Sequence, residues 1–103
     1  MPNQWSVVVP SDCEASLSLS VGAVLKMHEG IDPKRIFVPS KALRASGVAA
    51  EHLKGVSFVN DQSNFCYARR VNLAIKACAP DDVVIMGDDV ELMTKYGFDL
   101  LSA

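Results

Sequence analysis

Four short apolar runs rich in β-branched residues constrain the fold of this chain more than any other feature. They lie at residues 5–9, 35–38, 56–59 and 83–86, and their starts are about 20–30 residues apart. Nearly continuous apolar runs favour strands that are covered on both faces. This spacing leaves room for a helix between strands and is too long for hairpins. The sequence therefore predicts an α/β fold: a mostly parallel sheet of about four strands with flanking helices.

Helical patterns fill the first and third connections. Residues 11–14 have the form of a capping box, in which Ser11 caps the first helix and Glu14 reaches back. A clearer helix is expected over about 65–78, with a buried stripe of Ala68, Val71, Ile75 and Cys78. Weaker helical signals lie at 41–46, 51–54 and 91–96.

Composition narrows the class of protein. The 103 residues fit a single domain, and an apolar share of 50% with 21% charged residues is typical of a soluble globular protein. A net charge of −2 argues against a nucleic-acid binder. We see no apolar run long enough for a membrane span and no signal peptide. The three cysteines are scattered, which favours reduced thiols and a cytoplasmic protein.

Candidate site residues follow the strands, because ligands of parallel sheets bind beyond the carboxyl ends of the strands. Gly87, Asp88 and Asp89 come directly after the fourth run, and adjacent carboxylates there can hold a divalent cation that bridges to phosphates. A solvated acidic turn that caps a following helix explains the same residues. Ser11 and Asp12 follow the first run, either as helix caps or as contacts to a nucleotide.

Basic residues near the start of the second helix form another candidate. Arg69 and Arg70 could face the same edge as the two aspartates, since paired guanidinium donors suit a diphosphate. An exposed basic pair is the alternative. Asn72 is unusual in the middle of a helix, and it either ties the helix to the loop after the fourth strand or is exposed.

The stretch 64–77, followed by 81–92, resembles family 2 glycosyltransferases. Those proteins follow an "ARN-x-G-I-x-x-A" helix with a strand that ends in a D-x-D-type motif. Residues 7–11 are similar to their first strand, so the resemblance covers nearly the whole chain and is specific over 68–92. It implies a partial glycosyltransferase A-type fold that binds a nucleotide diphospho-sugar with Mn²⁺ or Mg²⁺.

The resemblance also implies roles for individual residues. Asp89 matches the acidic residue at the metal, and Asp88 matches the middle position of the motif, near the metal and the sugar or ribose. Residues matched to nucleotide-sugar contacts come from the first loop and the helix motif: Pro10, Ser11, Asp12, Arg69, Arg70 and Asn72.

Two departures shape the functional expectation. Gly87 stands at the first acidic position of the motif, and Ala74 replaces the usual glycine of the helix. Family members continue into an acceptor-binding half that supplies the catalytic base, and no residue here is assigned that role. We therefore expect the donor-binding half of a glycosyltransferase-like protein, inactive alone. The alternatives are a non-enzymatic α/β module that self-associates or binds a partner protein, and a small signalling domain with an acidic pocket.

Overall fold

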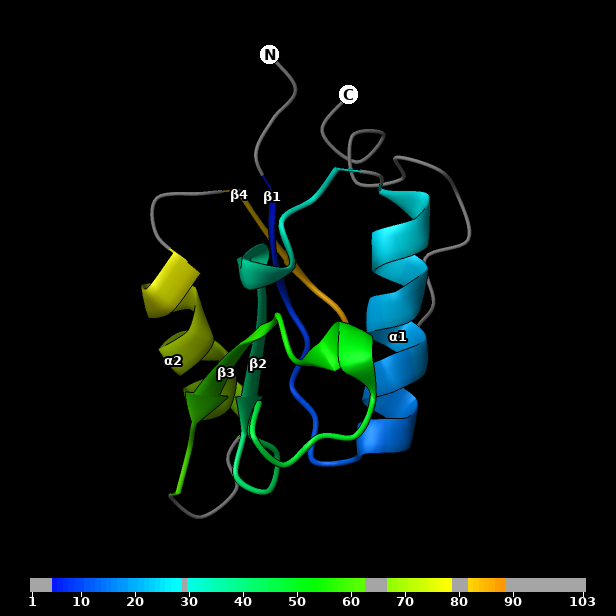
Figure 1. Ribbon diagram of the computed structural model, residues 1–103. Helices are drawn as coiled ribbons and strands as arrows, with labels where there is room; N and C mark the ends of the chain where they lie inside the picture. Colours follow the sequence, from blue (N-terminus) through cyan, green and yellow to red (C-terminus); the bar gives the residue numbers. More distant parts are fainter. Residues whose placement is uncertain (1–4, 29, 63–66, 79–81, 89–103) are drawn as a thin grey trace.

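The structure, a computed structural model, describes residues 5–28, 30–62, 67–78 and 82–88. Its elements follow in the order β1 (Trp5–Val8), α1 (Glu14–Met27), η1 (Pro33–Arg35), β2 (Ile36–Ser40), η2 (Glu51–Leu53), β3 (Ser57–Asn60), α2 (Tyr67–Cys78) and β4 (Asp82–Ile85) (Figure 1). The predicted α/β class is confirmed, and the strands begin within two residues of the predicted positions.

All four strands are parallel and pair in the order β3-β2-β1-β4. Strand β1 is central, with Val8 opposite Phe37 of β2 and Ile85 of β4. The chain moves outward from β1 through β2 to β3, and it then returns to place β4 on the other side of β1. The direction of winding therefore reverses between β1 and β4, and ligands of open α/β sheets bind at such a reversal.

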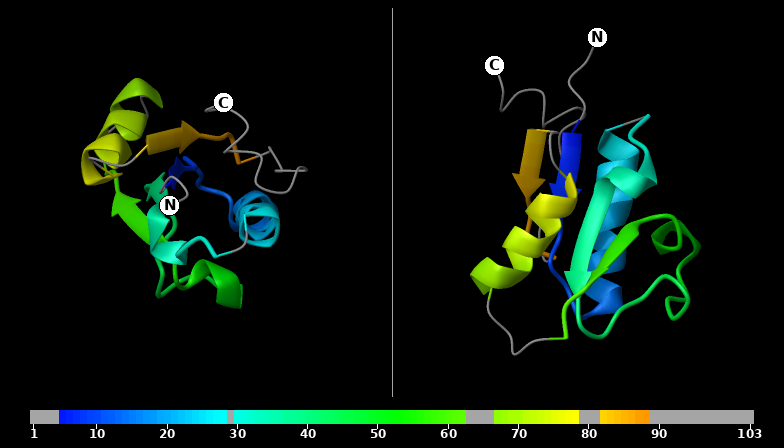
Figure 2. Two further views of the ribbon diagram at one scale, coloured as in Figure 1. Left: turned by 90° about the horizontal axis from the view of Figure 1, so that it is seen from above. Right: turned by 90° about the vertical axis from the view of Figure 1, so that its left-hand side faces the viewer.

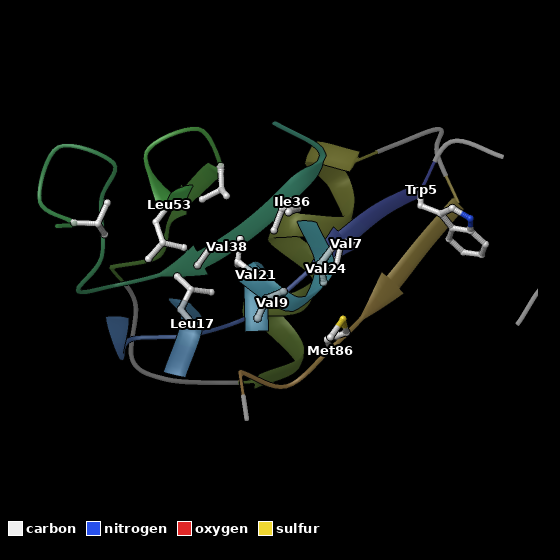
Figure 3. Packing of buried hydrophobic residues seen from close by; sticks show 12 residues of the cluster. Trp5, Val7, Val9, Leu17, Val21, Val24, Ile36, Val38, Leu53 and Met86 are labelled. Carbon is white, nitrogen blue, oxygen red and sulfur yellow. The ribbon is translucent and has the colours of Figure 1, made fainter. Parts of the chain in front are cut away.

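The two α-helices cover opposite faces of the sheet (Figures 1 and 2). Alternation along β1 and the residue after it explains this, since Val7 and Val9 join the core on the α1 side while Val8 joins a smaller cluster on the α2 side. The α1-side core also contains Leu17, Val21, Val24, Ile36, Val38, Leu53 and Met86 (Figure 3). The smaller cluster joins Val8 to Ala74 and Cys78 of α2.

The connection from β2 to β3 has no α-helix, so the helix expected at 41–46 is wrong. The amides of Lys41 and Ala42 donate to the carboxylate of Asp12, and a turn closes between Arg44 and Gly47. The expected turn at 51–54 is found as η2. His52 of η2 packs against α1. Its Nε2 lies 3.0 Å from the carbonyl oxygen of Ser18 and 3.2 Å from the Oγ of the same serine.

The capping box expected at the start of α1 is also wrong. Cys13 is the N-cap residue and makes no side-chain cap hydrogen bond. The Glu14 carboxylate instead accepts from the amides of Ala49 and Ala50, at 2.9 and 3.1 Å. Glu14 therefore fastens the β2–β3 connection to α1, and Ser11 is left for another partner.

Helix α2 begins at Tyr67, and its buried face differs from the expected stripe. Ala68 is exposed and Ile75 only partly buried, so these two assignments are wrong. The buried residues are Arg70, Val71, Ala74 and Cys78. This rotation of α2 directs Arg70 toward the carboxylates of Asp12 and Asp61.

The turn expected at 91–96 lies outside the described residues. Within the described ranges, we find no helix with the length and apolar character of a membrane span.

Candidate functional site

A side-chain hydrogen bond links the loops that follow β1 and β4. Ser11 is buried just beyond β1, and its Oγ donates to Oδ2 of Asp88 at 2.8 Å. The same Oγ accepts from the amide of Cys13 at 3.1 Å, which fixes the turn into α1. Ser11 and Asp88 are 77 residues apart in the chain, and they meet at the reversal of winding between the two strands.

The Asp12 carboxylate joins β1 to the loop after β2. Its Oδ1 accepts from Oγ of Ser40 at 2.7 Å and from the amides of Lys41 and Ala42 at 2.8 and 3.1 Å. Its Oδ2 accepts from Nη1 of Arg70 at 2.8 Å. Partial burial acts to raise the pKa of Asp12, but the donors from Arg70, Ser40 and the two amides outweigh it and hold that pKa well below its usual range.

Arg70 joins α2 to both β1 and β3. Its Nε donates to Oδ2 of Asp61 at 3.1 Å, while its Nη1 binds Asp12. The side chains of Arg70 and Asp61 are each only 3% exposed, and that of Asp12 is 44% exposed. Burial acts to lower the pKa of Arg70, but its two carboxylate partners raise it overall. Arg70 therefore stays charged inside the protein.

These contacts lie along the carboxyl edge of the sheet in two sets, which the backbone joins between residues 11 and 12. One set pairs Ser11 with Asp88, and the other links Asp12 to Ser40 and, through Arg70, to Asp61. Together we call them the edge network. Its members are Ser11, Asp12, Ser40, Asp61, Arg70 and Asp88. It contains a residue at the end of each of the four strands. With three carboxylates and one guanidinium its formal charge is −2, so the edge favours a cation or a hydrogen-bond donor over a bare anion.

The structure brings together four of the residues predicted from sequence, namely Ser11, Asp12, Arg70 and Asp88. Pro10 lies half-buried in the same loop, next to Ser11. Arg69 and Asn72 are exposed on α2 and do not belong to the edge network. Asp89 lies outside the described residues.

Sequence reasoning missed two members of the network. Ser40 is the last residue of β2, and Asp61 comes directly after β3. Both therefore follow the rule that polar residues at the carboxyl ends of parallel strands meet at one edge. Applied to every strand, that rule would have found them. It would not have shown that Asp61 is buried against Arg70.

The described residues alone do not supply a full set of ligands for a divalent cation at this edge. The described part of the chain holds no group of three or more His, Cys, Asp or Glu side chains arranged for a metal. Asp12 and Asp61 are already paired with Arg70, while the described contact of Asp88 is to a hydroxyl. Mg²⁺ is commonly held by one or two carboxylates together with waters and substrate phosphates. Asp88 therefore fits a cation that a phosphate ligand helps to hold.

Comparison with known proteins gave no match among protein-family models, curated proteins or solved structures. The function of this chain is therefore inferred from the fold, the edge network and the resemblance of the sequence to family 2 glycosyltransferases.

Proposed function

We propose that this chain binds a nucleotide diphospho-sugar at the carboxyl edge of the sheet, between β1 and β4. One observation supports this most directly: the 2.8 Å hydrogen bond between Ser11 and Asp88 lies where the winding of the sheet reverses. Ligands of doubly wound sheets bind in that position. The resemblance of residues 68–92 to a nucleotide-sugar motif supports the same position independently of the geometry.

The charge of the edge network supports binding with a divalent cation. A diphosphate beside Asp88 would meet a network of charge −2 and be repelled. Mn²⁺ or Mg²⁺ would remove this repulsion by neutralising charge, which is the chemistry such a cation would supply here. The Asp88 carboxylate would hold the cation, and the Ser11 hydroxyl would fix the orientation of that carboxylate.

The pairing of Arg70 changes its proposed role. The side chain of Arg70 is 3% exposed and already binds Asp12 and Asp61, so it is not available to bind a diphosphate. Arg69, one residue earlier and exposed, is the candidate for a phosphate contact. The proposal is confined to donor binding, because no described residue is matched to the base of a sugar transfer.

Self-association is a second candidate function, and the exposed apolar side chains favour it. Ile85 is 46% exposed on β4, an edge strand of the described sheet, and Leu73 is 37% exposed on α2. Unpaired strand edges and apolar patches are common sites of contact between chains. Sedimentation equilibrium over a range of concentrations tests this candidate, and a strict monomer would contradict it.

Calorimetric titration tests the nucleotide proposal. The protein is titrated with UDP, GDP and their sugars, each with and without Mn²⁺ or Mg²⁺. We expect metal-dependent binding that Asp88→Asn weakens by roughly tenfold or more, the effect of losing a charged ligand, and that Ser11→Ala weakens less. Ser46→Ala, an exposed serine in a turn, is the matched control and should bind as the wild type does. Absence of binding to every nucleotide would contradict the proposal.

A further inference from the structure

We infer that Arg70 is the positioning residue of the carboxyl edge: from α2, it holds the loops after β1, β2 and β3 in the arrangement that places Ser11 beside Asp88. The part of this inference that concerns ligand affinity rests on the proposed function. The part that concerns the loops does not. The inference differs from the sequence-based expectation, in which Arg70 touched the diphosphate itself.

The geometry of the guanidinium supports this role. Nη1 donates to Asp12 at 2.8 Å and Nε donates to Asp61 at 3.1 Å, so one planar group fixes two carboxylates at once. Lysine cannot reproduce this, since its ammonium is a single point on a flexible stem. The spacing between the loops after β1 and β3 therefore depends on the fork of Arg70.

The effect of Arg70 extends beyond the two aspartates that it touches. Asp12 uses its other oxygen to accept from Ser40 and from the amides of Lys41 and Ala42, so its orientation fixes the loop after β2. Asp12 also follows Ser11 directly in the chain, so its position constrains the hydroxyl that donates to Asp88. A change at Arg70 on α2 is thus transmitted to Asp88 through Asp12 and Ser11 in the loop after β1.

Burial of both side chains strengthens the ion pair between Arg70 and Asp61. Asp61 is 3% exposed, and its amide also donates to the carbonyl oxygen of Ser40 at 3.0 Å. Water therefore competes poorly for the pair of Arg70 and Asp61. The pair of Arg70 and Asp12 is more open on the Asp12 side, where the carboxylate is 44% exposed. Arg70 is anchored through Asp61 and orients Asp12.

Amide hydrogen exchange without any ligand tests the positioning role. In Arg70→Lys we expect the amides of Lys41 and Ala42 to exchange about tenfold faster than in the wild type, because the acceptor Asp12 is no longer held in place. Arg69→Lys, the exposed neighbour on the same helix, is the matched control and should leave both amides unchanged. Equal exchange in Arg70→Lys and Arg69→Lys would overturn the inference.

A second variant covers the case in which Arg70→Lys does not fold. Asp61→Asn keeps the shape of the side chain and an acceptor oxygen, but it removes the buried charge that anchors Arg70. We expect the same amides of Lys41 and Ala42 to exchange several-fold faster, although Asp61 touches neither of them. Unchanged amide exchange in Asp61→Asn would show that Asp61 does not affect the position of Asp12 through Arg70, and it would overturn the inference.

Titration of the same variants with UDP and Mn²⁺ separates this inference from the proposed function. If the wild type binds the nucleotide, Arg70→Lys should weaken binding and also speed amide exchange at Lys41 and Ala42. Arg69→Lys changes the residue proposed to contact phosphate, so it should leave that exchange unchanged whatever it does to binding. If the wild type binds none while Arg70→Lys still speeds exchange at Lys41 and Ala42, the proposed function fails and the positioning role stands. Tight wild-type binding that Arg70→Lys leaves unchanged would overturn the role of Arg70 in placing the ligand site.

Discussion

At the scale of single residues, the position of a charged side chain decides what it does. Arg69 and Arg70 are neighbours on α2, but the first is exposed and the second is buried between Asp12 and Asp61. Removing one partner of a buried ion pair is costly, since it leaves an uncompensated charge. The edge network therefore constrains which residues these positions tolerate, whatever ligand the edge binds.

Acid should weaken the fold through Asp12. Its pKa is lowered in the folded protein, so its contribution to stability is present above about pH 4 and is lost as the pH falls toward the folded value. Because the carboxylate is 44% exposed and partly screened, we expect a contribution of about 1 kcal/mol. Urea unfolding near neutral pH and at about pH 3 measures it.

The comparison variant for that measurement is Asp12→Asn, which cannot ionise. It should lose less stability between the two pH values than the wild type does. Asp32→Asn changes a carboxylate that only caps η1, so it serves as the control. Identical pH dependence of the wild type and Asp12→Asn would contradict the role given to Asp12.

The sequence predicted part of the site, for a physical reason. Ser11, Asp12 and Asp88 could be placed together because each follows an apolar run, and parallel strands end at one edge. The pairing of Arg70 with Asp12 could not be predicted, because Arg70 lies within a helix and the strand ends do not fix which helix residues face the sheet. Their meeting depends on how far α2 is rotated, and its apolar pattern alone favoured a different face.

At the scale of elements, competing hydrogen bonds explain where the sequence-based boundaries were wrong. The capping box at residues 11–14 had the right residue types, but Ser11 donates to Asp88 and Glu14 binds Ala49 and Ala50. A local sequence pattern predicts hydrogen bonds between neighbouring residues, but Ser11 and Glu14 bind residues that are distant in the chain. The strands were placed well because a continuous apolar run requires burial on both faces in any arrangement.

Two glycines should respond to alanine with opposite signs. Gly22 lies within α1, and a Cβ there would be 3.8 Å from Nε2 of His52, an ordinary contact. Gly22→Ala should therefore raise stability by about 0.5–1 kcal/mol through helix propensity. Gly30 has a φ of 86°, so Gly30→Ala should lower stability by roughly 1 kcal/mol although nothing crowds the site.

Thermal or urea unfolding of the two glycine variants checks both signs in one experiment. A loss of stability in Gly22→Ala would show that the contact between α1 and His52 leaves no room for a methyl group. A neutral Gly30→Ala would contradict the cost expected for alanine at the positive φ of Gly30.

At the scale of the whole molecule, different interactions hold the two helices to the sheet: mainly apolar burial for α1, and ion pairs to a larger extent for α2. Among the described residues, the core on the α1 face has twelve buried members, while the cluster on the α2 face has three. Helix α2 depends correspondingly more on the ion pairs of Arg70. Apolar burial is insensitive to pH, whereas ion pairs are lost in acid, so the two layers should respond differently to conditions.

Helix α2 should therefore open before α1. In native-state hydrogen exchange, we expect the amides of α2 to exchange through an opening of lower free energy than those of α1. Lowering the pH from about 5 to about 3 should widen the difference, because the stabilisation that Arg70 gains from ionised Asp12 is progressively lost in that range. The α1 amides of the same sample serve as the internal control. A single common opening free energy at every pH and urea concentration would contradict this order.

The strand order also has a consequence for the growing chain during synthesis. Strand β1 emerges first, but one of its two neighbours is β4, the last strand of the described sheet. Until residue 85 has left the ribosome, one hydrogen-bonding side of β1 lacks its native neighbour. The hydrogen bond of Ser11 likewise cannot form until Asp88, 77 residues later, has been synthesised. At about 5–20 residues per second this delay lasts several seconds, and a nascent chain that stalls within it has neither its complete sheet nor the proposed ligand site.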